Sequence, residues 1–381
     1  MSFLTAWQAL NGGGVDPTRT RLVQELRHNS PFISCRFDPT GRFVFAGAQD
    51  NTIQRFALAD NGRVAFEGHR SWVRSVAFQA ASGKLISGDH AGDVLIWSVD
   101  AAAPSPERTI AAHRGWVRAI AFHAPSGKLI SGDHAGDVLV WSIDAAAPSP
   151  ERTIAAHRGW VRAIAVSPNG EQLATCGNDN LVKVWSFATG DLVRELSGHT
   201  SHVYNVAYHP SGTRLASGDL HGNIKEWDLS DVREVRTLDG RVLHRYDPTF
   251  RADHGGIRSM AFNADGSLLA CAGITDVTNA FAGIGRPLVV LFNWQTGQRQ
   301  QLLRPAAQFQ GTAWGVQFHP AGFIAAAGAG NGGALWFWRP DQANSFHAVT
   351  LPNNARDLHL HPDGRRWAIP FFDNTVRIYE M

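Results

Sequence analysis

The sequence predicts an all-β fold of repeated four-stranded sheets, and three observations support this. First, the segment 69–112 recurs at 113–156, and the two copies of 44 residues differ at only seven positions. Second, the same succession of short apolar stretches and polar turns recurs in weaker form along most of the chain. Third, 38 glycines and 13 tryptophans accompany stretches that are too short for helices. This combination is typical of short strands separated by tight turns.

Each repeat carries signals for three strands in a fixed order. An apolar-rich strand such as WVRSVAF comes first, and a polar turn such as SPNG or HPSG follows it. A second strand such as KLISG leads to a tight turn, and a third strand then ends in tryptophan. A fourth strand, for example ERTIAA or DLVRELSG, lies between successive units. The closing tryptophans of the clearest units are Trp97, Trp141, Trp185 and Trp227.

Eight such units follow one another along the chain. One weaker unit, 33–56, precedes the four clear copies, and three weaker units follow them up to Met381. The last unit lacks its outer strand, whereas a spare strand-like segment from Arg21 to His28 precedes the first unit. Because an open row of sheets leaves exposed edges, we expect this segment to complete the last blade and close a ring of eight. Seven blades is the alternative, since the near-identical pair suggests that one blade was copied into a smaller ring.

These motifs resemble those of the WD-repeat (WD40) β-propeller family. The sequence has GH at Gly68-His69 and Gly198-His199, and WD at Trp227-Asp228. The resemblance implies a single closed β-propeller over residues 18–381, made of four-stranded blades. Residues 1–17 have no place in the ring, and we expect them to form an N-terminal packing or docking segment.

In this family, a His, a Ser or Thr, an Asp and a Trp of one blade form a buried hydrogen-bond chain. The resemblance implies that chain fully in one blade, through His157, Thr175, Asp179 and Trp185. Three other blades depart from the pattern and carry an aspartate eight residues before their tryptophan. We expect these aspartates to accept unpaired backbone N–H groups of the adjacent turn. They are Asp89, Asp133 and Asp219.

Composition argues against several classes of partner and location. A net charge of +2, with 18% charged residues, gives no steering toward nucleic acid or anionic membranes. No apolar run approaches the roughly 20 residues that span a bilayer, so we expect no membrane insertion. The cysteines, Cys35, Cys176 and Cys271, are odd in number and widely spaced. We therefore expect buried thiols in a reducing compartment, the cytoplasm.

The motifs predict no catalytic, metal or cofactor site. The Asp and His of GDHAGD recur around a ring, whereas catalysis needs one convergent site. No His and Cys cluster has the spacing of a zinc site. The glycine-rich stretch from Gly328 to Gly333 does not open a helix, so it lacks the mechanism of a phosphate-binding loop. We expect a protein that is not an enzyme and does not require an oligomer.

Two insertions into the repeat mark a candidate binding surface. The stretch 241–253 and the loop 274–286 are expected to project from the same face, next to each other. Both contain Arg and aromatic residues, which are typical of binding hot spots. In the alternative, the two loops only pack on each other. The candidates in these insertions are Arg241, His244, Arg245, Tyr246, Arg251, Phe281 and Arg286.

A Trp-X-Arg pattern recurs three times near the same face. Exposed arginines there would bind acidic or phosphorylated peptide, because a guanidinium pairs bidentately with carboxylate and phosphate. In the alternative, the tryptophans cover the blades beneath them and the arginines pair with Asp89 and Asp133. The six residues are Trp72, Arg74, Trp116, Arg118, Trp160 and Arg162.

The sequence therefore favours a non-catalytic protein–protein interaction scaffold that presents loops of a rigid propeller to a partner. One alternative is a reader of acidic or phosphorylated peptides through the arginines. Another, by analogy with proteins in which near-identical blades are gained and lost, is the recognition subunit of a bacterial-type defence or signalling assembly.

Overall fold

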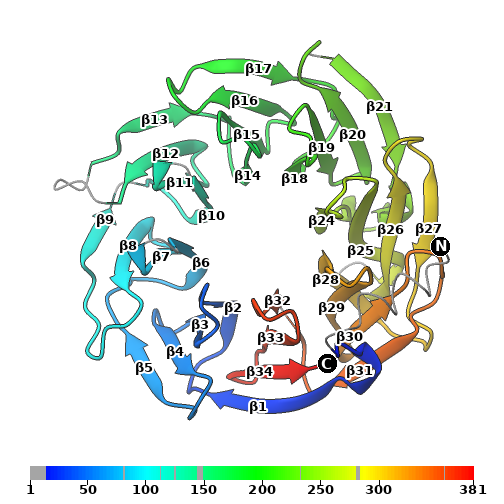
Figure 1. The fold of residues 1–381 in the computed structure, drawn as a ribbon. Helices are drawn as coiled ribbons and strands as arrows, with labels where there is room; N and C mark the ends of the chain where they lie inside the picture. The colour runs from blue at the N-terminus through cyan, green and yellow to red at the C-terminus, as the bar shows by residue number, and fades with distance from the viewer. Residues whose placement is uncertain are drawn as a thin grey trace.

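A computed structural model of the chain describes residues 14–79, 82–111, 113–123, 126–143, 149–231, 233–279, 284–355 and 357–381. These residues form eight four-stranded antiparallel sheets, arranged as blades around a common axis (Figure 1). The prediction of an all-β ring of eight blades is confirmed, and the alternative of seven blades is wrong.

In the first seven blades, the strands run in chain order from the axis to the rim. Blade 1 has β2 (Phe32–Phe37), β3 (Phe43–Ala48), β4 (Ile53–Ala57) and β5 (Arg63–Phe66). Blade 2 has β6 (Val73–Gln79), β7 (Lys84–Asp89), β8 (Asp93–Ser98) and β9 (Arg108–Ala111). Blade 3 has β10 (Val117–His123), β11 (Lys128–Asp133), β12 (Asp137–Ser142) and β13 (Arg152–Ala155), and blade 4 has β14 (Val161–Val166), β15 (Gln172–Gly177), β16 (Val182–Ser186) and β17 (Leu192–Leu196).

The second half of the ring follows the same order and carries one extra hairpin. Blade 5 has β18 (Val203–Tyr208), β19 (Arg214–Asp219), β20 (Asn223–Asp228) and β21 (Arg233–Asp239); the hairpin has β22 (His244–Asp247) and β23 (Ala252–Gly255); blade 6 has β24 (Ser259–Phe262), β25 (Leu268–Asn279), β26 (Ile284–Asn293) and β27 (Arg299–Leu303); blade 7 has β28 (Gly311–Phe318), β29 (Ile324–Gly330), β30 (Gly332–Trp338) and β31 (His347–Leu351); blade 8 has β32 (His359–Leu360), β33 (Arg366–Pro370), β34 (Thr375–Glu380) and β1 (Arg21–Arg27).

Strand β1 closes the ring by pairing with the last strand of the chain. It runs antiparallel to β34, with Arg21 opposite Glu380 and Arg27 opposite Thr375. Leu26 is buried in the apolar cluster that joins blade 8 to blade 1. The expectation that the segment from Arg21 to His28 completes the last blade is confirmed.

The hydrophobic core lies between neighbouring blades. The cluster between blades 1 and 2, for example, contains Phe45 and Phe66 from one blade and Val73 and Trp97 from the other. The rings of Phe66 and Trp97 meet edge to face at a centroid distance of 5.4 Å. Because the middle strands are buried on both faces, one blade cannot cover its own apolar surface. The repeats therefore stabilise one another around the ring.

The buried hydrogen-bond chain is present where the sequence implied it. In blade 4, the Nδ1 atom of His157 lies 2.8 Å from the Asp179 carboxylate, and its Nε2 atom lies 2.8 Å from Thr175 Oγ1. Trp185 donates its indole N–H to the same hydroxyl at 2.9 Å.

The structure extends this chain to blades that depart from the motif. In blade 5, His199 Nδ1 lies 2.9 Å from Asp219, its Nε2 lies 2.7 Å from Ser217 Oγ, and Trp227 donates to that hydroxyl at 2.7 Å. The displaced aspartate also accepts the backbone N–H of Asn223, as expected for a turn carboxylate. Blades 2 and 3 place Asp89 and Asp133 within 3.1 Å of their histidines.

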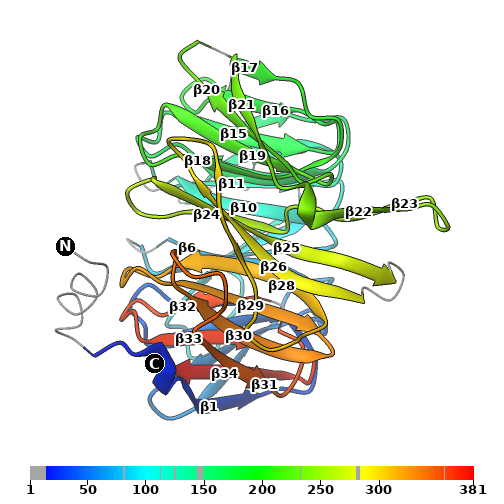
Figure 2. The same ribbon diagram turned by 90° about the vertical axis from the view of Figure 1, so that its right-hand side faces the viewer.

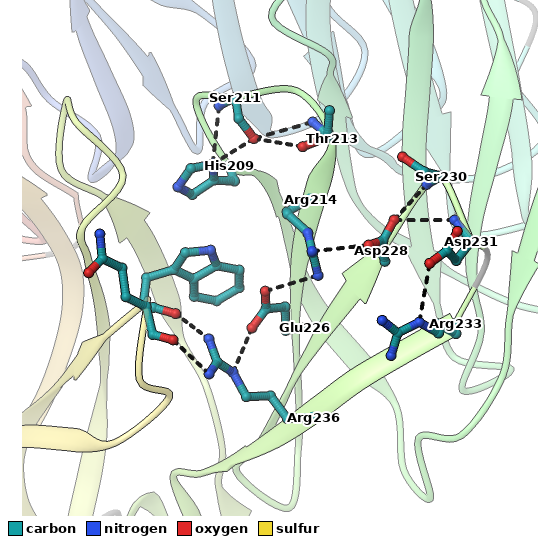
Figure 3. A network of polar contacts seen from close by, with 12 residues as sticks. His209, Ser211, Thr213, Arg214, Glu226, Asp228, Ser230, Asp231, Arg233 and Arg236 are labelled. Carbon is teal, nitrogen blue, oxygen red and sulfur yellow. Dashed lines mark hydrogen bonds and ion pairs between the residues drawn. The ribbon is translucent and has the colours of Figure 1, made fainter.

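Arginines of the outer strands in blades 3, 4 and 5 each join their blade to the next one. In blade 5, Arg236 of β21 pairs with Glu226 at 2.6 Å and also donates to the backbone carbonyls of Trp294 and Gln295 in blade 6 (Figure 3). Arg214 joins the same network at Glu226 and Asp228. The Arg236 contacts therefore join blade 5 to blade 6.

The described helices are two three-residue 3-10 turns, η1 (Pro17–Arg19) and η4 (Arg241–Leu243). No helix in the described ranges has the length and hydrophobicity needed to cross a membrane. Cys35, Cys176 and Cys271 are free and buried, as expected. Burial raises the pKa of each thiol.

Residues 1–13 of the N-terminal segment lie outside the described residues, so a packing or docking role for 1–17 stays a prediction. Val15, which is described, packs against the apolar cluster of blades 7 and 8. Asp16 caps η1 by accepting the backbone N–H of Thr18 at 2.9 Å.

Candidate functional site

A hollow lies on the axis where the chain enters the inner strands, and β-bulges place its lining. In six inner strands, the ladder register shifts at one residue near the start of the strand. A bulge residue is left unpaired and its side chain is re-aimed, which is why bulges occur next to binding sites. All six bulge residues line cavities on the axis. They are Ile33, Arg74, Arg118, Arg162, Tyr204 and Trp314.

Four guanidinium groups line one hollow, whose volume is about 320 Å³. Arg74, Arg118 and Arg162 come from three successive inner strands, and Arg258 stands directly before β24. Blade 5 contributes Tyr204 at the same register position. The structure thus brings together the three arginines of the Trp-X-Arg pattern and adds a fourth. We call these four residues the arginine cluster.

Aromatic rings hold part of the arginine cluster in place. The Arg162 guanidinium lies 4.3 Å from the Tyr204 ring centroid and 4.4 Å from that of Trp160. Arg258 lies 5.7 Å from Tyr204 and 5.6 Å from Trp314. Rings in these positions attract a cation through their quadrupole while leaving its N–H donors available.

The arginine cluster has no carboxylate partner of its own among the described residues. Arg162 donates to the neutral amide oxygen of Asn178 at 2.6 Å. The acidic residue of the hollow, Asp357, forms an ion pair with Arg36 instead. The Nε atom of Arg258 is buried without a hydrogen-bond acceptor. The cluster therefore presents an excess of positive charge to the hollow.

Aspartates do not neutralise these arginines, contrary to one alternative drawn from the sequence. Asp89 and Asp133 lie beside their buried histidines and accept backbone N–H groups of their turns. Different arginines, Arg70 and Arg114, pair with the neighbouring Asp93 and Asp137 on the outside. The expectation of Arg74 and Arg118 paired with Asp89 and Asp133 is wrong because the histidine chain already uses both carboxylates.

Crowding of like charges is visible in the electrostatics of the cluster. Burial, and then repulsion by Arg74 and Arg162, lowers the pKa of Arg118 to about 10. Burial also lowers the pKa of Arg258. Both groups stay protonated at neutral pH, and an anion bound between them would relieve the repulsion.

A row of five aromatic rings in contact with one another borders the arginine cluster. Trp72, His90, Trp116, His134 and Trp160 follow one another with centroid separations of 5.7, 4.2, 4.6 and 3.9 Å. Each histidine stacks on the tryptophan of the next blade, with ring planes within 2° and 3° of parallel. Trp72 and Trp116 remain 44% and 45% exposed. The tryptophans thus cover neighbouring turns and still offer an aromatic surface.

The two insertions lie on one side of the ring. In Figure 2, the hairpin β22–β23 and the far ends of β25 and β26 extend from the same side. Arg245 of the hairpin donates to the backbone carbonyl of Val277 in β25. Tyr246 is 51% exposed on the hairpin.

The remaining insertion candidates differ in their surroundings. Arg241 pairs with Asp239 at 2.9 Å, and His244 lies 2.8 Å from Asp253. Arg251 and Arg286 are exposed. Phe281 lies outside the described residues.

Among the described residues, one group of three side chains could hold a metal ion: His221, His244 and Asp253. It lies at the base of the hairpin. The glycine-rich stretch from Gly328 to Gly333 lies at the turn between β29 and β30.

Comparison with known proteins assigns the chain to a family. A family profile described as "WD domain, G-beta repeat" matches residues 20–55, 62–98, 104–142, 148–186, 190–228 and 247–276, more than half of the chain. The chain belongs to the WD-repeat family. WD-repeat propellers generally mediate protein–protein interaction, and they are typically non-catalytic scaffolds that bind proteins or peptides.

Among solved structures, the crystal structure of the computationally designed Ika8 protein is similar to this WD-repeat chain. The TM-score is 0.73 at 21% identity, and the match covers 94% of this chain and 100% of that chain. At this identity the likeness shows the shared fold alone. No curated protein matched the chain.

Sequence reasoning missed several lining residues of this WD-repeat site. Arg258, Tyr204 and Trp314 share the axial position with Arg74, but none of them stands in a Trp-X-Arg pattern. A register alignment of all inner strands would have found them. His90 and His134 recur 44 residues apart, in step with the tryptophans on which they stack.

Proposed function

We propose that this WD-repeat protein is a non-catalytic interaction scaffold whose arginine cluster binds an acidic or phosphorylated segment of a partner protein. One observation carries this proposal: four guanidinium groups line one axial hollow, and among the described residues none of them forms an ion pair with a carboxylate. A guanidinium binds carboxylate or phosphate through paired, charge-assisted hydrogen bonds.

The cost of crowding four cations supports a ligand-binding role over a structural one. Burial, and then repulsion by Arg74 and Arg162, makes the charged form of Arg118 less stable in the folded protein, as its lowered pKa indicates. An anion bound in the hollow offsets the repulsion among the arginines. It also forms charge-assisted hydrogen bonds with them in a partly desolvated site, where such bonds are stronger than in water. The buried, unpaired Nε of Arg258 is a donor ready for such a ligand.

The row of five aromatic rings beside the arginine cluster gives the peptide a second point of contact. Trp72 and Trp116 are exposed beside the arginine cluster, and a neighbouring cavity of about 410 Å³ is lined by Trp72, His90 and Arg74. Apolar residues flanking an anionic group would pack on these rings. The site therefore favours a peptide with mixed anionic and apolar residues over a bare anion.

Thermal unfolding in phosphate tests the proposal. Inorganic phosphate should raise the melting temperature of the full chain above that in sodium chloride of equal ionic strength. At a phosphate concentration of about 100 times the dissociation constant, the folded state gains about 2.7 kcal/mol. Arg118→Gln should lose most of this gain, because it removes a donor and one of the four cationic charges.

Arg114→Gln is the matched control. Arg114 lies four residues earlier in the same blade and pairs with Asp137 outside the hollow, so its loss should leave the phosphate effect unchanged. Equal stabilisation of the wild-type protein and Arg118→Gln would contradict the proposal. Stabilisation by oligonucleotides at concentrations where phosphorylated peptides have no effect would contradict a protein partner.

A further inference from the structure

Three metal-donor side chains converge where the inserted hairpin meets blade 5. His244 Nε2 lies 2.8 Å from one carboxylate oxygen of Asp253, and His221 Nε2 lies 3.5 Å from the other. The three donor atoms all lie within 4.8 Å of one another. His221 stands in the turn between β19 and β20, whereas His244 and Asp253 stand on the two strands of the hairpin.

All three residues are departures from the repeat. The turn position of His221 holds Ala91 and Ala135 in the near-identical blades, where GDHAGD replaces GDLHGN. His244 and Asp253 belong to a hairpin that the other blades lack. Two independent departures, the turn residue and the hairpin, therefore meet at one point, which ordinary repeat packing does not require.

The donor set has the chemistry of a transition-metal site. Two imidazole nitrogens and one carboxylate bind Zn²⁺ at about 2.0–2.2 Å, with a fourth position left for water or another ligand. Ligands at this range in a tetrahedron lie roughly 3.4 Å apart, close to the 3.5 Å between His221 and Asp253. The shorter contact of 2.8 Å between His244 and Asp253 is a hydrogen bond, which a bound ion would replace. The other nitrogen of His221 lies 3.5 Å from Thr200 Oγ1, and such outer contacts orient the ring of a ligating histidine.

Neighbouring cations do not compete for the carboxylate. Arg241 pairs with Asp239, and Arg245 donates to the carbonyl of Val277. The side chains of His221 and Asp253 are each 32% exposed, and that of His244 is 19% exposed. An ion can therefore reach the group from solvent without opening the fold.

We infer that His221, His244 and Asp253 form a binding site for a divalent transition-metal ion of the zinc class, which fastens the inserted hairpin to blade 5. The ion links the turn of a regular blade to both strands of the hairpin. It thereby fixes the direction in which the hairpin presents the exposed Tyr246.

Isothermal titration of the chelator-treated full chain with ZnCl₂ tests this inference. The wild-type protein should bind one Zn²⁺ ion at this site, and His221→Ala should weaken this binding by more than about 100-fold. That loss exceeds the roughly tenfold to 100-fold effect of removing an outer-shell partner. His221→Ala introduces the residue that the sister blades already have at this position, so the fold tolerates it. His244→Ala should give the same loss.

Another histidine–aspartate pair supplies the control. His28 lies 2.5 Å from Asp50, and no third donor joins them within the part of the chain that the structure describes, so His28→Gln should leave zinc binding intact. Hydrogen exchange gives an independent readout, because zinc should slow exchange of the amides at 244–255 in the wild-type protein alone. Equal zinc affinity of wild-type and both alanine variants, or binding that leaves hairpin exchange unchanged, would overturn the inference. Phosphate stabilisation of His221→Ala should match the wild type, so the two sites are tested separately.

Discussion

At the residue scale, bulges decide which side chains face the axis. A regular inner strand would alternate its residues between the two faces of the blade. The extra residue at the bulge escapes this alternation, and Arg74, Arg118 and Arg162 occupy it in three successive blades. The same local distortion that ends the ladder thus gathers charge at the centre of the molecule.

His134 makes a pH-dependent contribution to stability that can be measured. Burial, and then Arg118 and Arg162, lower its pKa to about 4, while His90 adds a smaller effect and Asp133 opposes it. The unfolded chain takes up this proton near pH 6.5, whereas the folded protein does not until about pH 4. The contribution of neutral His134 to the free energy of unfolding is therefore fully present above pH 6.5, and it is lost as the pH falls toward 4.

His134→Phe should make the free energy of unfolding depend less on pH over this range. The variant keeps an aromatic ring to stack on Trp160 and removes the titrating group. Urea unfolding at several pH values between 4 and 7 measures the free energy of unfolding of both proteins. We expect the difference between them to shift in favour of the variant as the pH falls. A difference that does not vary over this range would contradict a His134 side chain that stays neutral in the folded protein.

At the element scale, strand β1 carries the closure of the ring. It pairs along its length with β34, buries Leu26, and adds ion pairs from Arg21 to Glu380 and from Glu25 to Arg377. Without it, β34 becomes an exposed edge and the cluster between blades 8 and 1 loses one wall.

Deletion of residues 1–28 should therefore lower the free energy of unfolding by at least about 3 kcal/mol, on the scale of losing one buried leucine, and should promote association. Deletion of 1–13 is the control, because it leaves every described strand in place. Urea unfolding followed by tryptophan fluorescence, with size-exclusion chromatography, compares the two. Equal unfolding midpoints for both truncations would contradict closure by β1.

Elements and blades were predictable from the sequence to different degrees. The near-exact repetition located the strands of blades 2 and 3, and the missing outer strand after β34 predicted the role of Arg21–Arg27.

The arginine cluster was only half predictable. Its members are spread over 185 residues, from Arg74 to Arg258, and only the ring closure and the bulges bring them to one axis. Likewise, no local spacing joins His221 to Asp253.

At the scale of the whole molecule, the outer parts of the ring stabilise the fold, whereas its centre holds the arginine cluster. The histidine chains, the inter-blade clusters and the outer arginines such as Arg236 stabilise a rigid frame. The inner bulges hold the arginine cluster on that frame, and the insertions extend from one side of it (Figure 2). Preorganised donors lose little entropy on binding, so this arrangement suits specific recognition of a partner segment.

The most direct test of the central claim is the affinity of the full chain for peptides from a degenerate library, prepared with phosphoserine, with glutamate and with serine at one fixed position. Fluorescence polarisation should rank the phosphorylated pool first, the glutamate pool second and the serine pool last. Arg258→Gln should weaken binding of the phosphorylated pool by about tenfold to 100-fold, the loss expected for one charge-assisted hydrogen bond, and should leave the serine pool unchanged. Equal affinity for the three pools would contradict the claim that the arginine cluster binds an acidic or phosphorylated segment. An Arg258→Gln variant that binds the phosphorylated pool as tightly as the wild type would contradict it too.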